Sequence, residues 1–92
     1  MNPYTIQPVP TDIMILMAQR LRHLRKQAKF SQVELAGRSN VSLGSLKRFE
    51  HTGKISLESL LRLAHVLGKL NDFTRVLKPD EDLSRIAKLF DK

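Results

Sequence analysis

Residues 31–50 have the sequence SQVELAGRSNVSLGSLKRFE, and this stretch decides the fold. Ser31, followed three residues later by Glu34, forms a capping box, which predicts the start of a helix. Asn40 suits the left-handed backbone turn that ends such a helix. Ser42 is a favourable cap for a second helix. The stretch therefore predicts two short helices joined by a tight turn.

The apolar residues of this stretch are placed where such a pair of helices needs buried contacts. We expect Leu35 and Ala36 to face inward from the first helix, and Ala36 suits the point where two helices cross. Val41 is expected to enter the core from the turn. Leu46 and Phe49, three residues apart, form the predicted buried pair of the second helix. The polar side of that helix is then predicted to face outward.

Helices are also predicted on both sides of this helix-turn-helix. Capping residues and a three-four apolar spacing predict a long helix that starts at Thr11 or Asp12 and ends near residue 28. The same signals predict a fourth helix over residues 57–67 and a short fifth helix, capped by residue 71 or 72 and ended by Pro79. The predicted fold class is all-α, with five helices.

The chain divides into three predicted parts. Residues 1–10 contain three prolines, which exclude a regular helix and predict an extended or flexible arm. Residues 11–78 form the predicted helix-turn-helix domain. Residues 79–92 form an amphipathic tail, expected to be a short helix. Three alternatives are open for this tail: it folds back on the domain, pairs with a second subunit or binds another partner.

The positive charge of the chain is concentrated on the predicted motif. The net charge of the 92 residues is +7, and residues 20–54 alone hold nine basic and two acidic residues, which is also +7. A solvated basic face is the ordinary alternative. The concentration of the whole excess on one unit instead favours a polyanionic partner.

Several classes of protein and site are excluded by composition. The absence of cysteine excludes disulfides and thiolate metal sites and suits a reducing compartment. The three histidines fall on different predicted elements and no glycine-rich phosphate loop is present, so we predict no catalytic residue, metal site or cofactor, and no enzyme. The apolar run 13–18 is too short to span a bilayer, and a cytoplasmic location is expected.

The predicted fourth helix carries apolar residues on two sides. One side is expected to face the domain core, and the other needs a second partner. We predict that this second side is the interface of a homodimer. Its residues are Leu63, Val66 and Leu70.

Residues 16–76 resemble the lambda-repressor-like, or Xre/Cro, family of helix-turn-helix proteins. The marks of this resemblance are Ser-Gln-x-x-Leu-Ala from Ser31, the Asn-Val turn at 40–41 and Ser-x-x-x-Leu-x-x-Phe-Glu from Ser42, followed by Gly53. The resemblance implies a five-helix core. It also implies dimeric binding to a palindromic operator in double-stranded DNA and, usually, repression of transcription.

Carried onto this sequence, the resemblance implies a set of DNA contacts. Gln32 is expected at a phosphate, together with the backbone N–H groups at the start of its helix. Arg48 is the expected base contact, because its guanidinium matches guanine O6 and N7, and Lys47 is expected at a phosphate. The full predicted DNA-binding set is Gln32, Ser42, Leu43, Gly44, Ser45, Lys47, Arg48, Arg25, Lys26 and Arg38.

The second helix of the motif departs from the family pattern at its start. Gln or Arg is common there, whereas this chain has Leu43 and Gly44. Gly44 weakens a helix by about 0.5–1 kcal/mol relative to Ala but permits close approach to DNA. Leu43 is expected either to meet a thymine methyl group or to pack internally. Few direct contacts to bases are therefore expected, and DNA shape is expected to supply part of the specificity.

A closer likeness is to the HipB-like antitoxins. It rests on the proline-containing segment 4–10 before the first helix, the small size and the tail beyond the core. This likeness implies an antitoxin that represses its own operon and binds a HipA-type kinase toxin. The alternatives are a stand-alone or phage-type repressor and a bridging module that binds protein without DNA.

Overall fold

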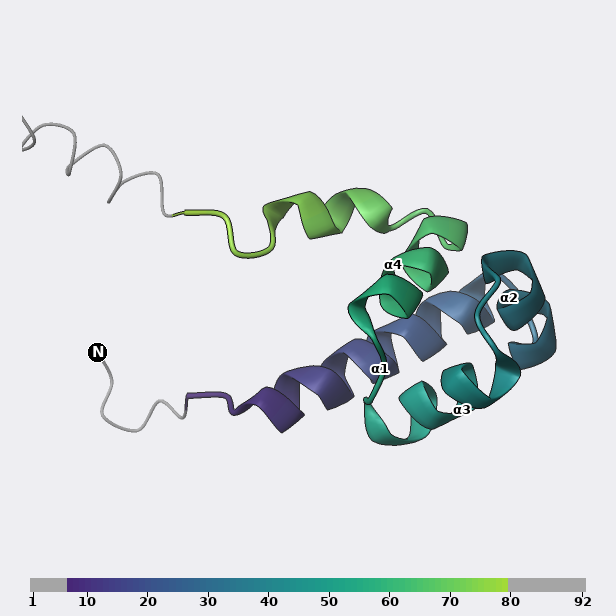
Figure 1. Ribbon diagram of the computed structural model, residues 1–92, viewed down its shortest axis with the longest axis horizontal. Helices are drawn as coiled ribbons and strands as arrows, with labels where there is room; N and C mark the ends of the chain where they lie inside the picture. Colours follow the sequence, from purple (N-terminus) through teal and green to yellow (C-terminus); the bar gives the residue numbers. More distant parts are fainter. Residues whose placement is uncertain (1–6, 80–92) are drawn as a thin grey trace, which may run out of the picture.

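The computed structural model describes residues 7–79, which form four α-helices and one 3₁₀ helix without any strand in that range (Figure 1). The elements are α1 (Pro10–Gln27), α2 (Gln32–Ser39), α3 (Leu43–Thr52), α4 (Leu57–Val66) and η1 (Leu70–Arg75). The all-α prediction is confirmed. The predictions for residues 1–6 of the arm and 80–92 of the tail lie outside the described residues.

Helix α1 begins earlier than predicted. Its N-cap is Val9, whose backbone N–H donates to Asp12 Oδ2 at 3.0 Å. The prediction that Thr11 or Asp12 caps the helix is therefore wrong, because Asp12 reaches back from the first turn. Pro10 occupies the first helical position, where a missing N–H costs nothing.

The capping box of α2 is formed as predicted. Ser31 Oγ accepts from the Glu34 backbone N–H, and the Glu34 carboxylate accepts from the Ser31 backbone N–H, each at 3.0 Å. The backbone donor of Ser31, then its hydroxyl, holds the pKa of the Glu34 carboxyl below its ordinary value. Asn40 ends the helix in the left-handed region, with φ 57° and ψ 36°, as predicted.

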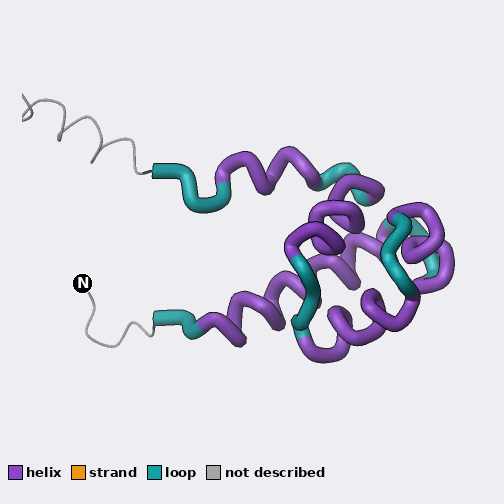
Figure 2. Tube along the Cα trace, viewed as in Figure 1, coloured by secondary structure: helices purple, strands orange, loops and turns teal. Residues whose placement is uncertain are grey.

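The next two helices also begin at the predicted serines. Ser42 Oγ accepts from the Ser45 backbone N–H, and Ser56 Oγ accepts from the Ser59 backbone N–H, both at 3.1 Å. Gly53 ends α3 with φ 80°. These local hydrogen bonds set the helix boundaries, and the helices and their connecting loops are seen in Figure 2.

One apolar core lies between the four α-helices. Helix α1 packs against α3, and α2 packs against both α3 and α4. Leu35, Leu46 and Leu63 are completely buried, and Phe49 is 1% exposed. The complete core cluster is Ala18, Leu21, Leu35, Ala36, Val41, Leu46, Phe49 and Leu63.

The core-facing side of α4 differs from the prediction. Leu63 is completely buried, so its assignment to a dimer interface is wrong. Val66 is half-buried and packs against the core, and only Leu70, 39% exposed, is open among the three predicted interface residues. Leu57, an apolar residue at the start of α4, is 67% exposed. The reason is the orientation of α4 about its own axis, which turns Leu60, Leu63, Ala64 and Leu67 inward. These four residues also follow a three-four spacing.

The fifth helix is a 3₁₀ helix instead of an α-helix. It starts at Leu70, before both predicted caps, and its N-cap Lys69 makes no side-chain capping bond. It packs against α4 and contains no buried residue. The helix has only six residues, and Leu77, two residues beyond it, has a left-handed backbone with φ 61°. A segment this short is typical of a 3₁₀ helix.

Candidate nucleic-acid interface

Helix α3 presents a polar side outward from an apolar anchor. Leu46 and Phe49 hold it on the core, and both are almost completely buried. The side chains of Ser45, Lys47 and Arg48 are exposed. This arrangement leaves one side of α3 open along its length for a ligand.

The two serines at the start of α3 form a local pair. Ser42 Oγ donates to Ser45 Oγ at 2.7 Å and also accepts from the Ser45 backbone N–H. The hydroxyl proton of Ser45 is consequently left to donate outward. Gly44 lies between them, and a Cβ at this position would have no neighbour within 4 Å. The start of α3 therefore offers a donor beside an open stretch of backbone.

Leu43 lies at the same end of α3 but is only half open. It is partly buried and packs against the core cluster. Internal packing, one of the two predicted roles, is therefore present in the structure.

Arg25 is a structural residue, which corrects its place in the predicted DNA-binding set. Its Nε donates to Glu50 Oε2 at 2.7 Å, and its Nη2 donates to Glu50 Oε1 at 3.0 Å. Its Nη1 donates to the Phe30 carbonyl oxygen at 2.8 Å. The residue is 8% exposed. With all three nitrogens engaged inside the protein, the guanidinium cannot approach DNA without breaking this network.

Glu50 joins three elements of the motif. It accepts from Arg25 at the end of α1 and from Gln32 Nε2, at the start of α2, at 3.0 Å. Glu50 itself lies in α3. These bonds fix the ends of the three helices relative to one another, and so hold the angle at which α3 is presented.

The sequence pattern did not predict this network, and Glu50 entered only as one residue of the family resemblance. A signal was nevertheless present. Arg25 continues the spacing of the buried residues Ala18 and Leu21, which places it on the core-facing side of α1. A charged residue at such a position needs a buried partner.

Gln32 is held at the start of α2 by its bond to Glu50. That bond uses one of its two amide N–H groups, which leaves the other as a donor. The side chain is half-buried. The first turn of a helix also leaves backbone N–H groups without intrahelical partners, and they suit an anion.

Two further predicted cations lie on the same part of the molecule. Lys26 is exposed in the last turn of α1, and Figure 1 shows that this end of α1 lies near α2. Arg38 is exposed in the last turn of α2, and its guanidinium carbon lies 4.7 Å from the centre of the Phe30 ring. This cation–π contact limits where the Arg38 side chain can reach.

The family model described as a helix-turn-helix domain matches residues 16–71, more than half of the chain. The chain belongs to this helix-turn-helix family. The matched region runs from α1 to the start of η1 and contains the complete α2–α3 pair. No curated protein and no solved structure matched in the corresponding comparisons. The family places this chain among DNA-binding helix-turn-helix proteins. Helix α3 is the second helix of the motif, and its polar side faces outward.

Residues 7–79 lack the features of two other kinds of site. That range contains no group of three or more histidine, aspartate or glutamate side chains arranged to hold a metal ion. No helix in it has the length and apolar composition needed to cross a membrane.

Proposed function

We propose that this helix-turn-helix protein is a sequence-specific, DNA-binding regulator of transcription that inserts α3 into the major groove. The observation that carries the proposal is the exposed side of α3, with Lys47 and Arg48 on it, above the buried pair Leu46 and Phe49. A helix held in this way by its apolar side can enter a groove without unfolding. The net charge of +7 on residues 20–54 supports a polyanionic partner.

The exposed residues divide by the kind of contact that their chemistry suits. Arg48 is assigned to a base, because its planar fork matches the two acceptors of guanine. Lys47 is assigned to a phosphate. Gln32 is assigned to a second phosphate through its remaining amide N–H, and Lys26 to a third.

The test of this assignment is Arg48→Ala, with binding measured on a selected operator and on random DNA. We expect the variant to lose about 1–3 kcal/mol on the operator and to relax preference at one base position. The control is Arg75→Ala, because Arg75 is also exposed but lies in η1. Equal losses on operator and random DNA would make Arg48 a phosphate contact. Unchanged binding to both would remove it from the interface.

We further propose that the protein acts as a dimeric repressor on a palindromic operator, with half-sites about 10–11 base pairs apart. The resemblance to the lambda-repressor-like family supports this proposal. Leu70 is the member of the predicted interface that is open to a partner. Leu70→Asp is expected to lower the sedimentation mass from dimer to monomer. An unchanged dimer mass would exclude Leu70 from the interface, and footprinting of a single half-site would contradict the palindrome.

The biological setting that we propose is an operon in which the protein represses its own synthesis and acts as the antitoxin of a HipA-type kinase toxin. The support is the HipB-like lead-in and tail in the sequence. The test is the neighbouring gene: a kinase-like product should bind the purified protein and should lose its toxicity on co-expression. A chromosomal or prophage neighbourhood without a kinase gene would favour a stand-alone repressor.

A further inference from the structure

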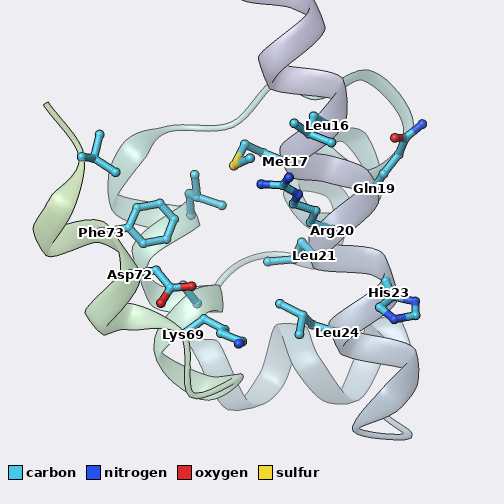
Figure 3. Close-up of a pocket in the computed structure, with 13 residues that line it drawn as sticks. Leu16, Met17, Gln19, Arg20, Leu21, His23, Leu24, Lys69, Asp72 and Phe73 are labelled. Atoms are coloured by element: carbon cyan, nitrogen blue, oxygen red, sulfur yellow. The ribbon is translucent and has the colours of Figure 1, made fainter.

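An apolar hollow of about 590 Å³ lies between α1 and η1 (Figure 3). Its α1 wall includes Leu16, Met17 and Leu24, and its η1 wall includes Phe73 and Val76. No residue that lines the hollow belongs to α2 or α3, and Figure 1 shows η1 away from α3, so the hollow is separate from the proposed DNA-binding surface.

The two apolar walls of the hollow face each other but do not pack together. Leu16, Met17 and Phe73 are only half-buried, and Val76 is 59% exposed. Helix η1 packs against α4 and faces α1 across the open space. Apolar surface on both sides of an unfilled space favours an occupant that is itself apolar.

The chain itself continues from the edge of this hollow. Val76 lines it, Pro79 is the last described residue, and the following thirteen residues are DEDLSRIAKLFDK. Their apolar residues Leu83, Ile86, Ala87 and Phe90 recur at three-four spacing, so a helix would carry them on one side.

The length and the charge of this segment both suit the hollow. The wall from Leu16 to Leu24 extends about 12 Å along α1, and a thirteen-residue helix extends about 20 Å. The segment begins with three acidic residues at 80–82, whereas the charged residues lining the hollow are Arg20, Lys69 and Asp72, with a net charge of +1. The net charge of the lining is thus opposite in sign to the charge at the start of the segment.

We propose that residues 83–90 pack as a helix into the hollow of their own chain and complete the core of the domain. Six residues separate Val76 from Leu83, and so short a tether gives the segment a high effective concentration at its own hollow, of millimolar order. The proposed occupant is thus the chain's own tail. Exchange of the segment with a second copy is the competing arrangement, which the capture experiment below distinguishes.

Disulfide capture in the full-length chain tests this packing directly, because the protein has no cysteine of its own. Gln19→Cys on the wall of the hollow is paired with Ala87→Cys at the middle of the segment. We expect mild oxidation to close a disulfide within one chain, recognised by the monomer mass. The control pairs Ala87→Cys with Lys47→Cys, since Lys47 is exposed on α3. Disulfides that form only between chains, or equally in the control, would overturn the proposal.

Two matched aspartate substitutions provide a second, independent measurement. Ile86→Asp places a charge on the side predicted to enter the hollow, and Ser84→Asp places the same charge outside that side. We expect Ile86→Asp to lower the equilibrium constant for folding by about ten-fold or more in urea titration, because a buried apolar side chain is replaced by a charged one. Ser84→Asp should leave that constant within about two-fold of the parent. Equal constants for the two variants would overturn the proposal.

Discussion

Arg25 and Glu50 form a buried ion pair between two helices, with their side chains 10% and 5% exposed. Each member of the pair makes a further hydrogen bond: the guanidinium also donates to the Phe30 carbonyl, and the carboxylate also accepts from Gln32. Neither partner is easily removed alone, because the remaining charge would stay buried without compensation.

Arg25→Met is therefore expected to lower the free energy of unfolding by about 3–5 kcal/mol. The cause is the unpaired Glu50 carboxylate, and urea titration measures it. The control is Lys26→Met, the neighbouring exposed position, which should change stability by less than about 0.5 kcal/mol. A double variant that also carries Glu50→Leu should recover part of the loss. Equal stabilities for the two single variants would contradict the structural role of Arg25.

Gly53 combines a positive φ with a close approach between α3 and α1. A Cβ at Gly53 would lie 2.8 Å from the backbone carbonyl carbon of Met14, and the φ of Gly53 is 80°. Gly68 offers a matched comparison, since its φ is 73° but a Cβ there meets nothing within 4 Å.

Gly68→Ala should consequently cost only the backbone strain, about 1–2 kcal/mol. Gly53→Ala should cost more than this, because α1 must also move away from α3. Thermal and urea unfolding of both variants measure the difference. If Gly53→Ala were no more destabilising than Gly68→Ala, the close approach of the two helices would not be tight in solution.

At the scale of the element, one position of α3, Gly44, is expected to affect the stability of the protein and the binding of a ligand in opposite directions. Gly44 lies inside this helix with ordinary helical backbone, and a methyl group at its Cα would meet nothing within 4 Å. Nothing in the fold requires glycine there. Glycine there would matter for a molecule that approaches the exposed side of α3 closely.

Gly44→Ala is expected to stabilise the protein by about 0.5–1 kcal/mol and to weaken operator binding at the same time. The control is Gly37→Ala in α2, which also meets nothing within 4 Å and should stabilise the protein without weakening binding. Unfolding and DNA-binding titrations on the same samples measure both effects. Unchanged operator affinity of Gly44→Ala would show that DNA does not approach this backbone.

At the scale of the whole molecule, the positive charge is carried by two different kinds of residue. Arg25 is neutralised inside the fold by Glu50, whereas Lys26, Arg38, Lys47 and Arg48 remain exposed. Because Arg25 and Glu50 cancel, the net charge of +7 on residues 20–54 comes from the other eight basic residues and Glu34. Salt dependence of binding distinguishes the two kinds, because only cations that contact phosphates release counterions.

Lys26→Ala is expected to weaken binding to operator and random DNA alike. The slope of log affinity against log salt should become shallower by about 0.9, the value for one phosphate contact. Arg75→Ala, an exposed cation in η1, serves as the control and should leave the slope unchanged. An unchanged slope for Lys26→Ala would remove this residue from the interface.

The local features of the fold were predictable because they depend on residues close together in the chain. The capping box of Ser31 and Glu34, the left-handed Asn40 and the caps Ser42 and Ser56 each involve partners within three residues or a single backbone conformation. The burial of Leu46 and Phe49 follows from the same short-range spacing. The start of α1 was misplaced because Asp12 is a residue of the first turn that bonds back to the cap.

The sequence by itself determined that the chain is a helix-turn-helix with a polar outer side on its second helix, since short-range hydrogen bonds and apolar spacing suffice for that. Only the tertiary structure decided which residues meet across the fold. Arg25 and Glu50 are 25 positions apart, and the rotation of α4 that buries Leu63 depends on its packing against α2. Such partners are chosen by the relative placement of whole helices, which no local pattern contains.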